Sequence, residues 1–245
     1  MIQEWFEYVR TDAPTWARER GLVYESIALR ARLNRQAPHW QSHLKNSQQE
    51  IKTFLSKFPY KKRVIVFGSG YLMEFPKPVI QDKTRSFILV DAVHPREIQK
   101  QLRAATNVEL LNLDLAQNAV SIYPHLERAI DADTLVISCN LLSQLPLSIV
   151  NGKDPAVDKE KTQLVIREHI SLLRKMRCPV LLLSDFERSF RCSKGNVLER
   201  ENTLPGLDLG SPDRHWTWNW APQGELSMEY AAELEVGKWE LNVSN

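Results

Sequence analysis

Two glycines one residue apart, Gly68 and Gly70, follow a short apolar run and enclose Ser69. Such a turn lets the backbone amides approach a ligand without a side chain in the way, although it is equally typical of a tight strand-to-helix turn in any α/β protein. Asp91 lies 21 residues beyond Gly70, after the next apolar run. A carboxylate at that place can accept hydrogen bonds from both hydroxyls of a ribose, so the pair predicts a nucleoside ligand.

The elements that must position these residues are short, β-branched apolar runs, which are typical of buried strands. They cover residues 64–67, 86–90, 108–113, 134–138 and 180–183, and stretches with helical spacing separate most of them. Alternating strands and helices predict a mainly parallel, Rossmann-like sheet, whose ligands bind at the carboxyl ends of the strands. The residues at those ends are Gly68, Asp91, Asp114, Asn140 and Asp185.

Both ends of the chain differ from this central pattern. Residues 1–60 contain two amphipathic stretches, punctuated by Gly21 and Pro38. They predict two separate helices within a helical segment or lid packed on a core domain of residues 61–245. Residues 216–220 alternate tryptophan with polar residues and, with a strand within 230–243, predict a closing antiparallel hairpin, although residues 228–234 could instead form a helical turn. Residues 186–213 are interpreted as a long irregular insertion that could cover a site.

This pattern resembles the class I S-adenosylmethionine-dependent methyltransferase superfamily over roughly residues 63–185 and the closing hairpin. The resemblance implies S-adenosylmethionine as the cofactor, with Gly68, Ser69 and Gly70 beside its methionine part. It also implies that Asp91 binds the ribose and that Asp114 lies near the adenine amino group. Asn140 would then lie where the substrate and the cofactor meet.

The glycine turn departs from the family pattern at two positions. Val66 stands where an acidic residue is frequent, and Leu72 stands where a third glycine is frequent. Glu74 could supply the missing carboxylate to the amino end of the cofactor, but a solvent-facing or helix-dipole role is an equal alternative. Met73 occupies the position where a nicotinamide fingerprint needs a small residue, which disfavours a pyrophosphate at this turn.

Methyl transfer depends mainly on in-line placement of a nucleophile, so a general base is optional. Asn140, with Ser143 and Gln144, could orient a polar substrate or could merely cap a helix. Asp185 is a candidate for proton removal. His215, next to the tryptophans, is a second candidate base, with ordinary packing as its alternative reading.

The charge balance and the lack of certain motifs argue against several other functions. Thirty-two Lys and Arg against 30 Asp and Glu leave a net charge of +2, which makes a nucleic-acid or membrane partner unlikely and leaves only the N-terminal arginines in favour of the former. No metal-ligand spacing, hydrolase elbow or phosphate-binding loop is present, and the three cysteines are interpreted as free thiols. With no secretory signal pattern and no apolar run of about 18 residues, the sequence predicts a cytoplasmic protein.

The sequence thus predicts a methyltransferase that acts on a small molecule or a protein. The alternative is a non-catalytic binding or scaffolding protein of the same fold, which the departures at Val66 and Leu72 favour. Nucleic-acid methylation is a weaker third possibility. The oligomeric state leaves no mark in the sequence.

Overall fold

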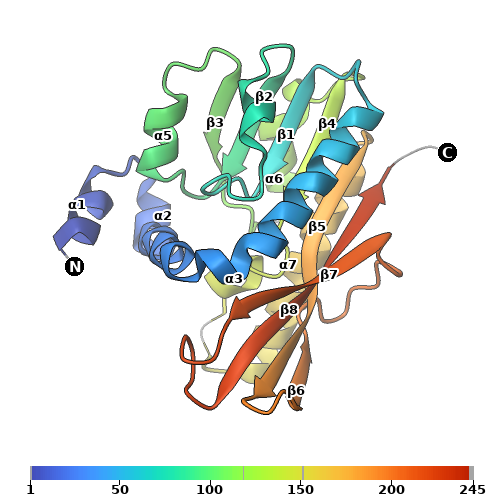
Figure 1. Cartoon of the computed structure of the whole chain (residues 1–245). Coiled ribbons are helices and arrows are strands. Elements are labelled where there is room, and N and C mark those ends of the chain that lie inside the picture. The colour runs from blue at the N-terminus through green and yellow to red at the C-terminus, as the bar shows by residue number, and fades with distance from the viewer. Residues whose placement is uncertain (1, 118, 151, 243–245) are drawn as a thin grey trace.

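The computed structural model describes residues 2–117, 119–150 and 152–242. Its strands form one sheet in the order β3-β2-β1-β4-β5-β8-β7, with β6 paired to β5 (Figure 1). The first five strands are parallel, and β6, β7 and β8 are antiparallel to their neighbours. The strands are β1 (Arg63–Phe67), β2 (Ser86–Asp91), β3 (Val108–Asn112), β4 (Thr134–Cys139), β5 (Val180–Cys192), β6 (Val197–Asn202), β7 (Arg214–Ala221) and β8 (Tyr230–Leu241). The predicted mainly parallel sheet and its closing hairpin are confirmed, while Val243 lies outside the described residues.

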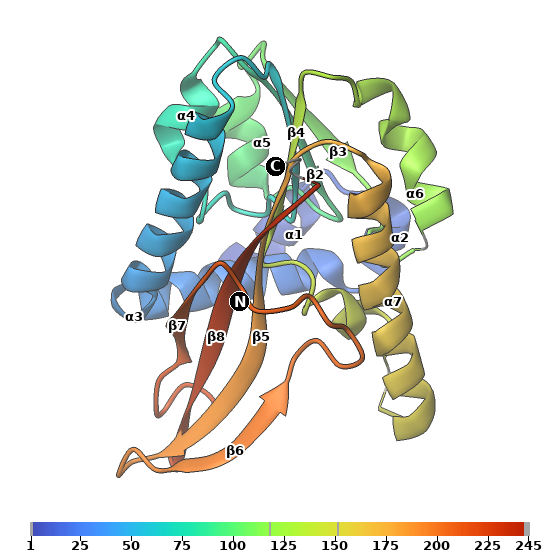
Figure 2. The same cartoon turned by 90° about the vertical axis from the view of Figure 1, so that its right-hand side faces the viewer.

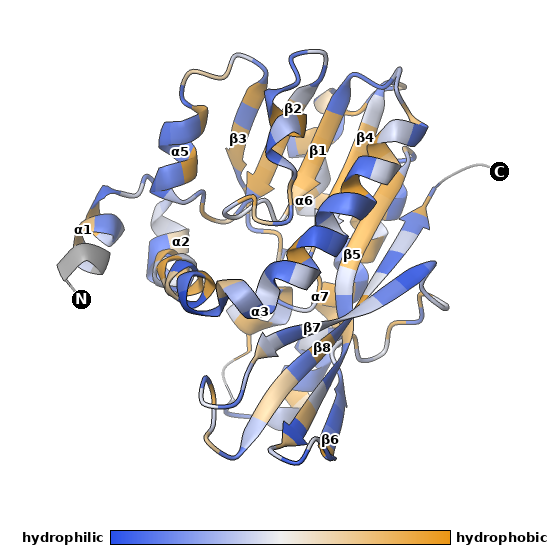
Figure 3. Cartoon of the chain, viewed as in Figure 1, coloured by the Kyte–Doolittle hydropathy of each residue, from blue (hydrophilic) through white to orange (hydrophobic). Residues whose placement is uncertain are grey.

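The central parallel strands β1, β2 and β4 are buried on both faces because helices cover both sides of the sheet (Figure 2). In β1, Val64 and Val66 pack into one core cluster and Ile65 and Phe67 into the other. This two-sided burial explains why these strands are continuous apolar runs, which Figure 3 shows in orange. The helices are α3 (Leu22–Lys57), α4 (Lys77–Gln81) and α5 (Arg96–Leu102) on one face, α6 (Ala119–Leu126) and α7 (Pro155–Lys175) on the other, and α1 (Ile2–Arg10) and α2 (Thr15–Glu19) before them in the chain.

The long helix α3 contains 36 residues and runs through Pro38, so the prediction of two separate helices in this region is wrong. A proline within a helix removes one backbone hydrogen bond and clashes with the preceding turn, which bends the helix without necessarily ending it. Figures 1 and 2 show α3 bent near its middle into two limbs. The first limb passes by the carboxyl ends of the parallel strands, and the second lies along the sheet.

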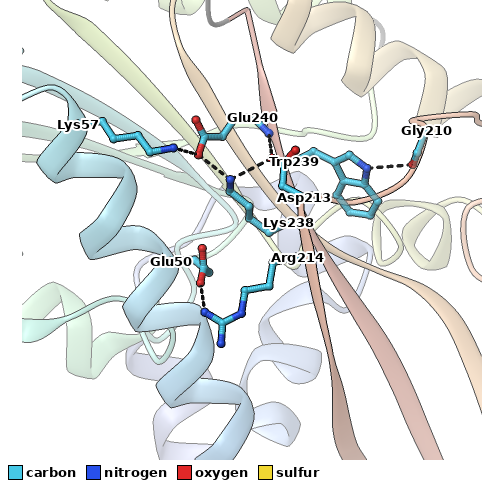
Figure 4. Close-up of polar contacts among 8 residues, drawn as sticks. All are labelled: Glu50, Lys57, Gly210, Asp213, Arg214, Lys238, Trp239 and Glu240. Atoms are coloured by element: carbon cyan, nitrogen blue, oxygen red, sulfur yellow. Dashed lines mark hydrogen bonds and ion pairs between the residues drawn. The ribbon is translucent and has the colours of Figure 1, made fainter.

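Ion pairs fasten the second limb of α3 to the closing hairpin (Figure 4). Glu50 binds Arg214 of β7 over 2.5 Å, and Lys57 binds Glu240 of β8 over 2.5 Å. Lys238 of β8 adds a further ion pair, since it also binds Glu240, at 2.6 Å. Helix α3 and the C-terminal hairpin are far apart in the sequence, but these ion pairs hold them together beside β5.

The segment predicted as an irregular insertion begins instead with a β-hairpin. Strand β5 continues to Cys192, and β6 pairs with its outer half beyond the end of β4. The pairing is lined by charges, as Arg188 lies 3.4 Å from Glu201 and Arg200 lies 3.0 Å from Glu187. Because β6 is exposed along most of its length, it lacks the apolar alternation by which a strand is recognised in a sequence.

Candidate functional site

The turn after β1 is shaped by its two glycines. Gly68 has a φ of 71°, and a Cβ atom there would lie 2.7 Å from the carbonyl oxygen of Cys139, so only glycine fits. Gly70 has a φ of 41°, and the nearest atom to an added Cβ is Asp91 Oδ2 at 3.9 Å. Gly68 thus lets β1 and β4 approach each other, whereas Gly70 leaves open space above its backbone.

Asp91 lies at the end of β2 and faces this turn. Its Oδ2 accepts a hydrogen bond from the Gly70 backbone N–H at 2.7 Å, and its Oδ1 accepts one from the Ala92 N–H at 2.7 Å. Burial raises the pKa of the Asp91 carboxyl, although the neighbouring His94 and the backbone N–H groups act in the opposite direction. Since a carboxylate offers about four acceptor positions, Asp91 can hold the turn and still accept further hydrogen bonds.

Glu74 and Asn140 meet on the other side of the turn. Asn140 directly follows β4, with a φ of 46°, and its backbone N–H donates to Leu183 of β5 at 2.8 Å. Its side-chain Nδ2 donates to Glu74 Oε1 at 3.2 Å. Burial acts to raise the pKa of the Glu74 carboxyl, but the neighbouring His43 and hydrogen bonds from the Glu74 backbone and Asn140 outweigh it, so that the pKa is lowered.

Two oxygens of this region are buried and have no hydrogen-bond partner among the described residues. One is Ser69 Oγ in the glycine turn, and the other is Asn140 Oδ1. Leaving a buried polar group unpaired costs roughly 1–3 kcal/mol, which makes such groups informative. The sequence resemblance implies that Ser69 lies beside the methionine part of the cofactor and Asn140 where the substrate and the cofactor meet.

His43 is a member of this group that the sequence analysis missed. The residue is fully buried on α3, with Nε2 3.2 Å from Asn140 Nδ2 and 3.7 Å from Glu74 Oε1. The signal that could have found it is a histidine on the apolar face of an amphipathic helix, three residues after Trp40 and eight before Ile51.

Asp114, two residues beyond β3, is covered by the N-terminal segment. Arg20, between α2 and α3, binds Asp114 Oδ2 with its Nη1 at 2.6 Å, and Gln117 Nε2 donates to the same oxygen at 3.2 Å. The Asp114 side chain is consequently 8% exposed. The N-terminal segment therefore contacts the carboxyl end of β3 directly, at the residue expected near an adenine.

Asp185 lies in β5 beside the loop that follows β4. Its Oδ1 accepts a hydrogen bond from Ser143 Oγ at 2.5 Å, and burial raises the pKa of its carboxyl. Ser143 belongs to the same loop as Asn140, whose carbonyl oxygen accepts a hydrogen bond from Gln144 at 2.8 Å. The structure thus connects Asp185 to the Asn140 loop through Ser143.

His215 is not brought to these residues. It lies on β7, the edge strand of the sheet, with a side chain that is 64% exposed and Nδ1 3.4 Å from Glu235. Three strands, β4, β5 and β8, separate β7 from β1. His215 therefore lies apart from the glycine turn.

Within the described ranges, no group of three or more His, Cys, Asp or Glu side chains could hold a metal ion. Among the same residues, no helix combines the length and the apolar character needed to cross a membrane.

No protein-family model matches the chain, and no curated protein matches it. Solved structures similar to it include the 1,6-didemethyltoxoflavin-N1-methyltransferase of Burkholderia thailandensis with bound 1,6-didemethyltoxoflavin and S-adenosylhomocysteine. The sequence identity is 12% and the TM-score is 0.43, and the match covers 93% of this chain and 92% of that one. A second is the N-terminal domain of EvdMO1 with S-adenosylhomocysteine bound, at 13% identity and a TM-score of 0.34, covering 78% and 80%. A third is the glycopeptide N-methyltransferase MtfA, at 15% identity and a TM-score of 0.30, covering 79% and 95%.

The described architecture is an α/β fold with a Rossmann-like, mainly parallel sheet. A mainly parallel sheet carries helices on both faces and closes with an antiparallel hairpin, as the sequence resemblance implies. The glycine turn, the acid at the end of β2 and the polar residue after β4 lie together at the carboxyl ends of neighbouring strands.

Proposed function

We propose that this protein is an S-adenosylmethionine-dependent methyltransferase that acts on a small molecule or a protein. The observation that carries the proposal is the convergence of three features on one turn. These are the open backbone at Gly70, the Asp91 carboxylate bonded to it, and the Glu74–Asn140 pair with an unpartnered Asn140 Oδ1.

The chemistry of these groups fits the parts of the cofactor one by one. Asp91 offers acceptors to the two ribose hydroxyls. The Glu74 carboxylate and Asn140 Oδ1 offer acceptors to a primary ammonium group, and the ammonium has three N–H donors to give. Ser69 Oγ, buried without a partner among the described residues, can bond to the amino-acid carboxylate.

The same residues disfavour a dinucleotide at this turn. Glu74 would place a carboxylate close to a pyrophosphate, and like charges in a partly buried site repel each other strongly. A sulfonium cofactor carries no phosphate and has a cationic amino group, which suits this acidic turn. When bound, the cofactor would supply an activated methyl group.

The remaining residues have roles that follow from their positions. Asn140, Ser143 and Asp185 border the place where a substrate would meet the cofactor, and Asn140 and Ser143 can orient it. Asp185 can remove a proton from the acceptor atom, since burial raises the pKa of its carboxyl and so favours the protonated form that results. Asp114, which is paired with Arg20, would lie near the adenine amino group.

Isothermal titration calorimetry with S-adenosylhomocysteine tests the proposal. We expect saturable binding by the wild-type protein and a loss of most of the affinity in Asp91→Asn. Glu109→Gln, which changes an exposed carboxylate on β3, is the matched control and should bind as the wild type does. Folded wild-type protein that gives no heat with ligand in the millimolar range would rule the proposal out.

A further inference from the structure

The buried side chain of His43 connects four separate elements. Its Nε2 faces Glu74 and Asn140, and its Nδ1 lies 3.1 Å from the indole nitrogen of Trp216. The imidazole ring is also stacked on Trp218, with centroids 3.9 Å apart and planes tilted by 7°. One ring on α3 therefore touches the glycine turn, the end of β4 and the closing hairpin.

The indole of Trp216 determines which nitrogen of His43 carries a proton. Its Nε1–H group is a donor only, so His43 Nδ1 must be the acceptor. The proton of the ring then belongs on Nε2, because a neutral imidazole carries one N–H. A second proton on Nδ1 would place two N–H groups against each other inside the core.

This tautomer aims a donor at Glu74. Asn140 Nδ2 donates to Glu74 Oε1 at 3.2 Å, and the Nε2–H of His43 lies 3.7 Å from the same oxygen, beyond hydrogen-bond distance. Since His43 Nε2 and Asn140 Nδ2 are both donors and lie 3.2 Å apart, Glu74 is the acceptor that both face. Because Asn140 turns its Nδ2 toward Glu74, its Oδ1 is the atom left without a partner among the described residues. The arrangement presents two acceptors, one charged and one neutral, to a ligand.

We infer that His43 is a positioning residue for the recognition of the ligand's ammonium group, an inference that rests on the proposed function. Trp216 sets the tautomer, Trp218 sets the plane of the ring, and the ring holds Glu74 and Asn140 in the orientation that receives the ammonium. Recognition of the amino-acid part of the ligand then depends on contacts from α3 and the C-terminal hairpin, outside the glycine turn itself.

Two ligands separate this role from general stability. S-adenosylhomocysteine carries the amino-acid part, whereas methylthioadenosine has the same adenosine and sulfur without an ammonium or carboxylate group. His43→Phe keeps a flat ring against Trp218 and removes the donor. We expect His43→Phe to weaken S-adenosylhomocysteine binding about tenfold, because Glu74 and Asn140 lose the N–H group that orients them, and to leave methylthioadenosine binding unchanged.

His43→Gln restores an N–H donor near the position of Nε2 and should recover most of the lost affinity. Trp216→Phe is a second variant that leaves the His43 ring in place and removes the bond to Nδ1 together with part of the indole packing. It serves if His43→Phe folds poorly, and the same selective loss is expected. Ser47→Ala is the matched control, because Ser47 is fully buried one turn along α3 and its hydroxyl has no partner among the described residues.

The outcomes distinguish this role from the proposed function. Wild-type protein that binds neither ligand would contradict the proposed function and this role together. Wild-type protein that binds both, with variants that weaken both ligands equally or neither, would contradict the positioning role alone. A selective loss of S-adenosylhomocysteine, recovered in His43→Gln, supports it.

Discussion

The backbone N–H of Gly70 donates to the carboxylate of Asp91 over 2.7 Å, which joins the turn after β1 to the end of β2. The bond fixes the Asp91 carboxylate beside an open stretch of backbone at Gly70. A ligand bound at Asp91 would therefore lie against main chain, without a side chain between. Asp91 and Gly70 therefore act as one structural feature.

Gly68→Ala should destabilise the fold more than the loss of a left-handed glycine alone explains. The positive φ costs an L-residue about 1–2 kcal/mol, and the Cβ contact of 2.7 Å with Cys139 adds overpacking of about 1–3 kcal/mol. Gly195→Ala is the matched control, since its φ is 83° and nothing lies within 4 Å of the added Cβ. Urea unfolding should show the greater loss for Gly68→Ala, and equal losses would contradict the close approach of β1 and β4.

Asp185→Asn should raise the stability of the protein at neutral pH. Because burial raises the pKa of the Asp185 carboxyl in the folded protein, this group loses its proton at a lower pH in the unfolded chain than in the folded protein. Stability therefore falls as the pH rises from the ordinary pKa of 3.8 through the folded pKa. Asparagine stays neutral and keeps the Oδ1 that accepts from Ser143. The gain over the wild type should therefore grow with pH in urea titrations at several pH values.

Asp82→Asn is the control of opposite sign for that experiment. A hydrogen bond from Thr84 lowers the pKa of the Asp82 carboxyl, so the charged form contributes stability above 3.8 that is lost as the pH falls. Its replacement should cost a little stability at neutral pH. A pH dependence of the same sign in both variants would contradict the burial of Asp185.

Arg20→Gln should speed the release of S-adenosylhomocysteine with little effect on stability. The Arg20 side chain is 40% exposed, so its ion pair with Asp114 contributes about 0–1 kcal/mol, and release should be faster by up to about fivefold. Arg35→Gln, which loses an ion pair with Glu225 of 2.7 Å, is the control. Stopped-flow dissociation rates that are the same in both variants would argue against a covering role for the N-terminal segment.

Trp40→Ala should cost about 3–5 kcal/mol of unfolding free energy, because Trp40 is fully buried between α3 and the hairpin. Its indole N–H donates to the Trp220 carbonyl at 2.9 Å, and its ring meets Trp218 edge-on. Tyr24→Ala, at an exposed position of the same helix, should change stability by less than about 0.5 kcal/mol. Similar values for both variants would mean that α3 adds little to the stability of the fold.

The sheet and its ligand edge could be predicted because they depend on local patterns. Five short apolar runs, each ending in a glycine or a polar residue, correspond to β1 to β5, and burial on both faces makes such runs easy to recognise. The contact between Gly70 and Asp91 follows from the same pattern, since neighbouring parallel strands end at the same edge.

The remaining features depend on tertiary contacts that no local pattern carries. Pro38 bends α3 instead of ending it because the second limb is held to the hairpin by Glu50 and Lys57. Strand β6 is exposed and charged, so apolar alternation gives no signal for it. The partners of His43 include Trp216, 173 residues away, and only the folded chain brings them together.

A crystal structure of the wild-type protein with S-adenosylhomocysteine tests the central claim most directly. We predict that the ribose hydroxyls lie within hydrogen-bond distance of the Asp91 carboxylate. The ammonium group should lie between Glu74 and Asn140 Oδ1, with the backbone of Gly70 against the ligand. A ligand bound elsewhere on the molecule, or one with its ribose turned away from Asp91, would contradict the account.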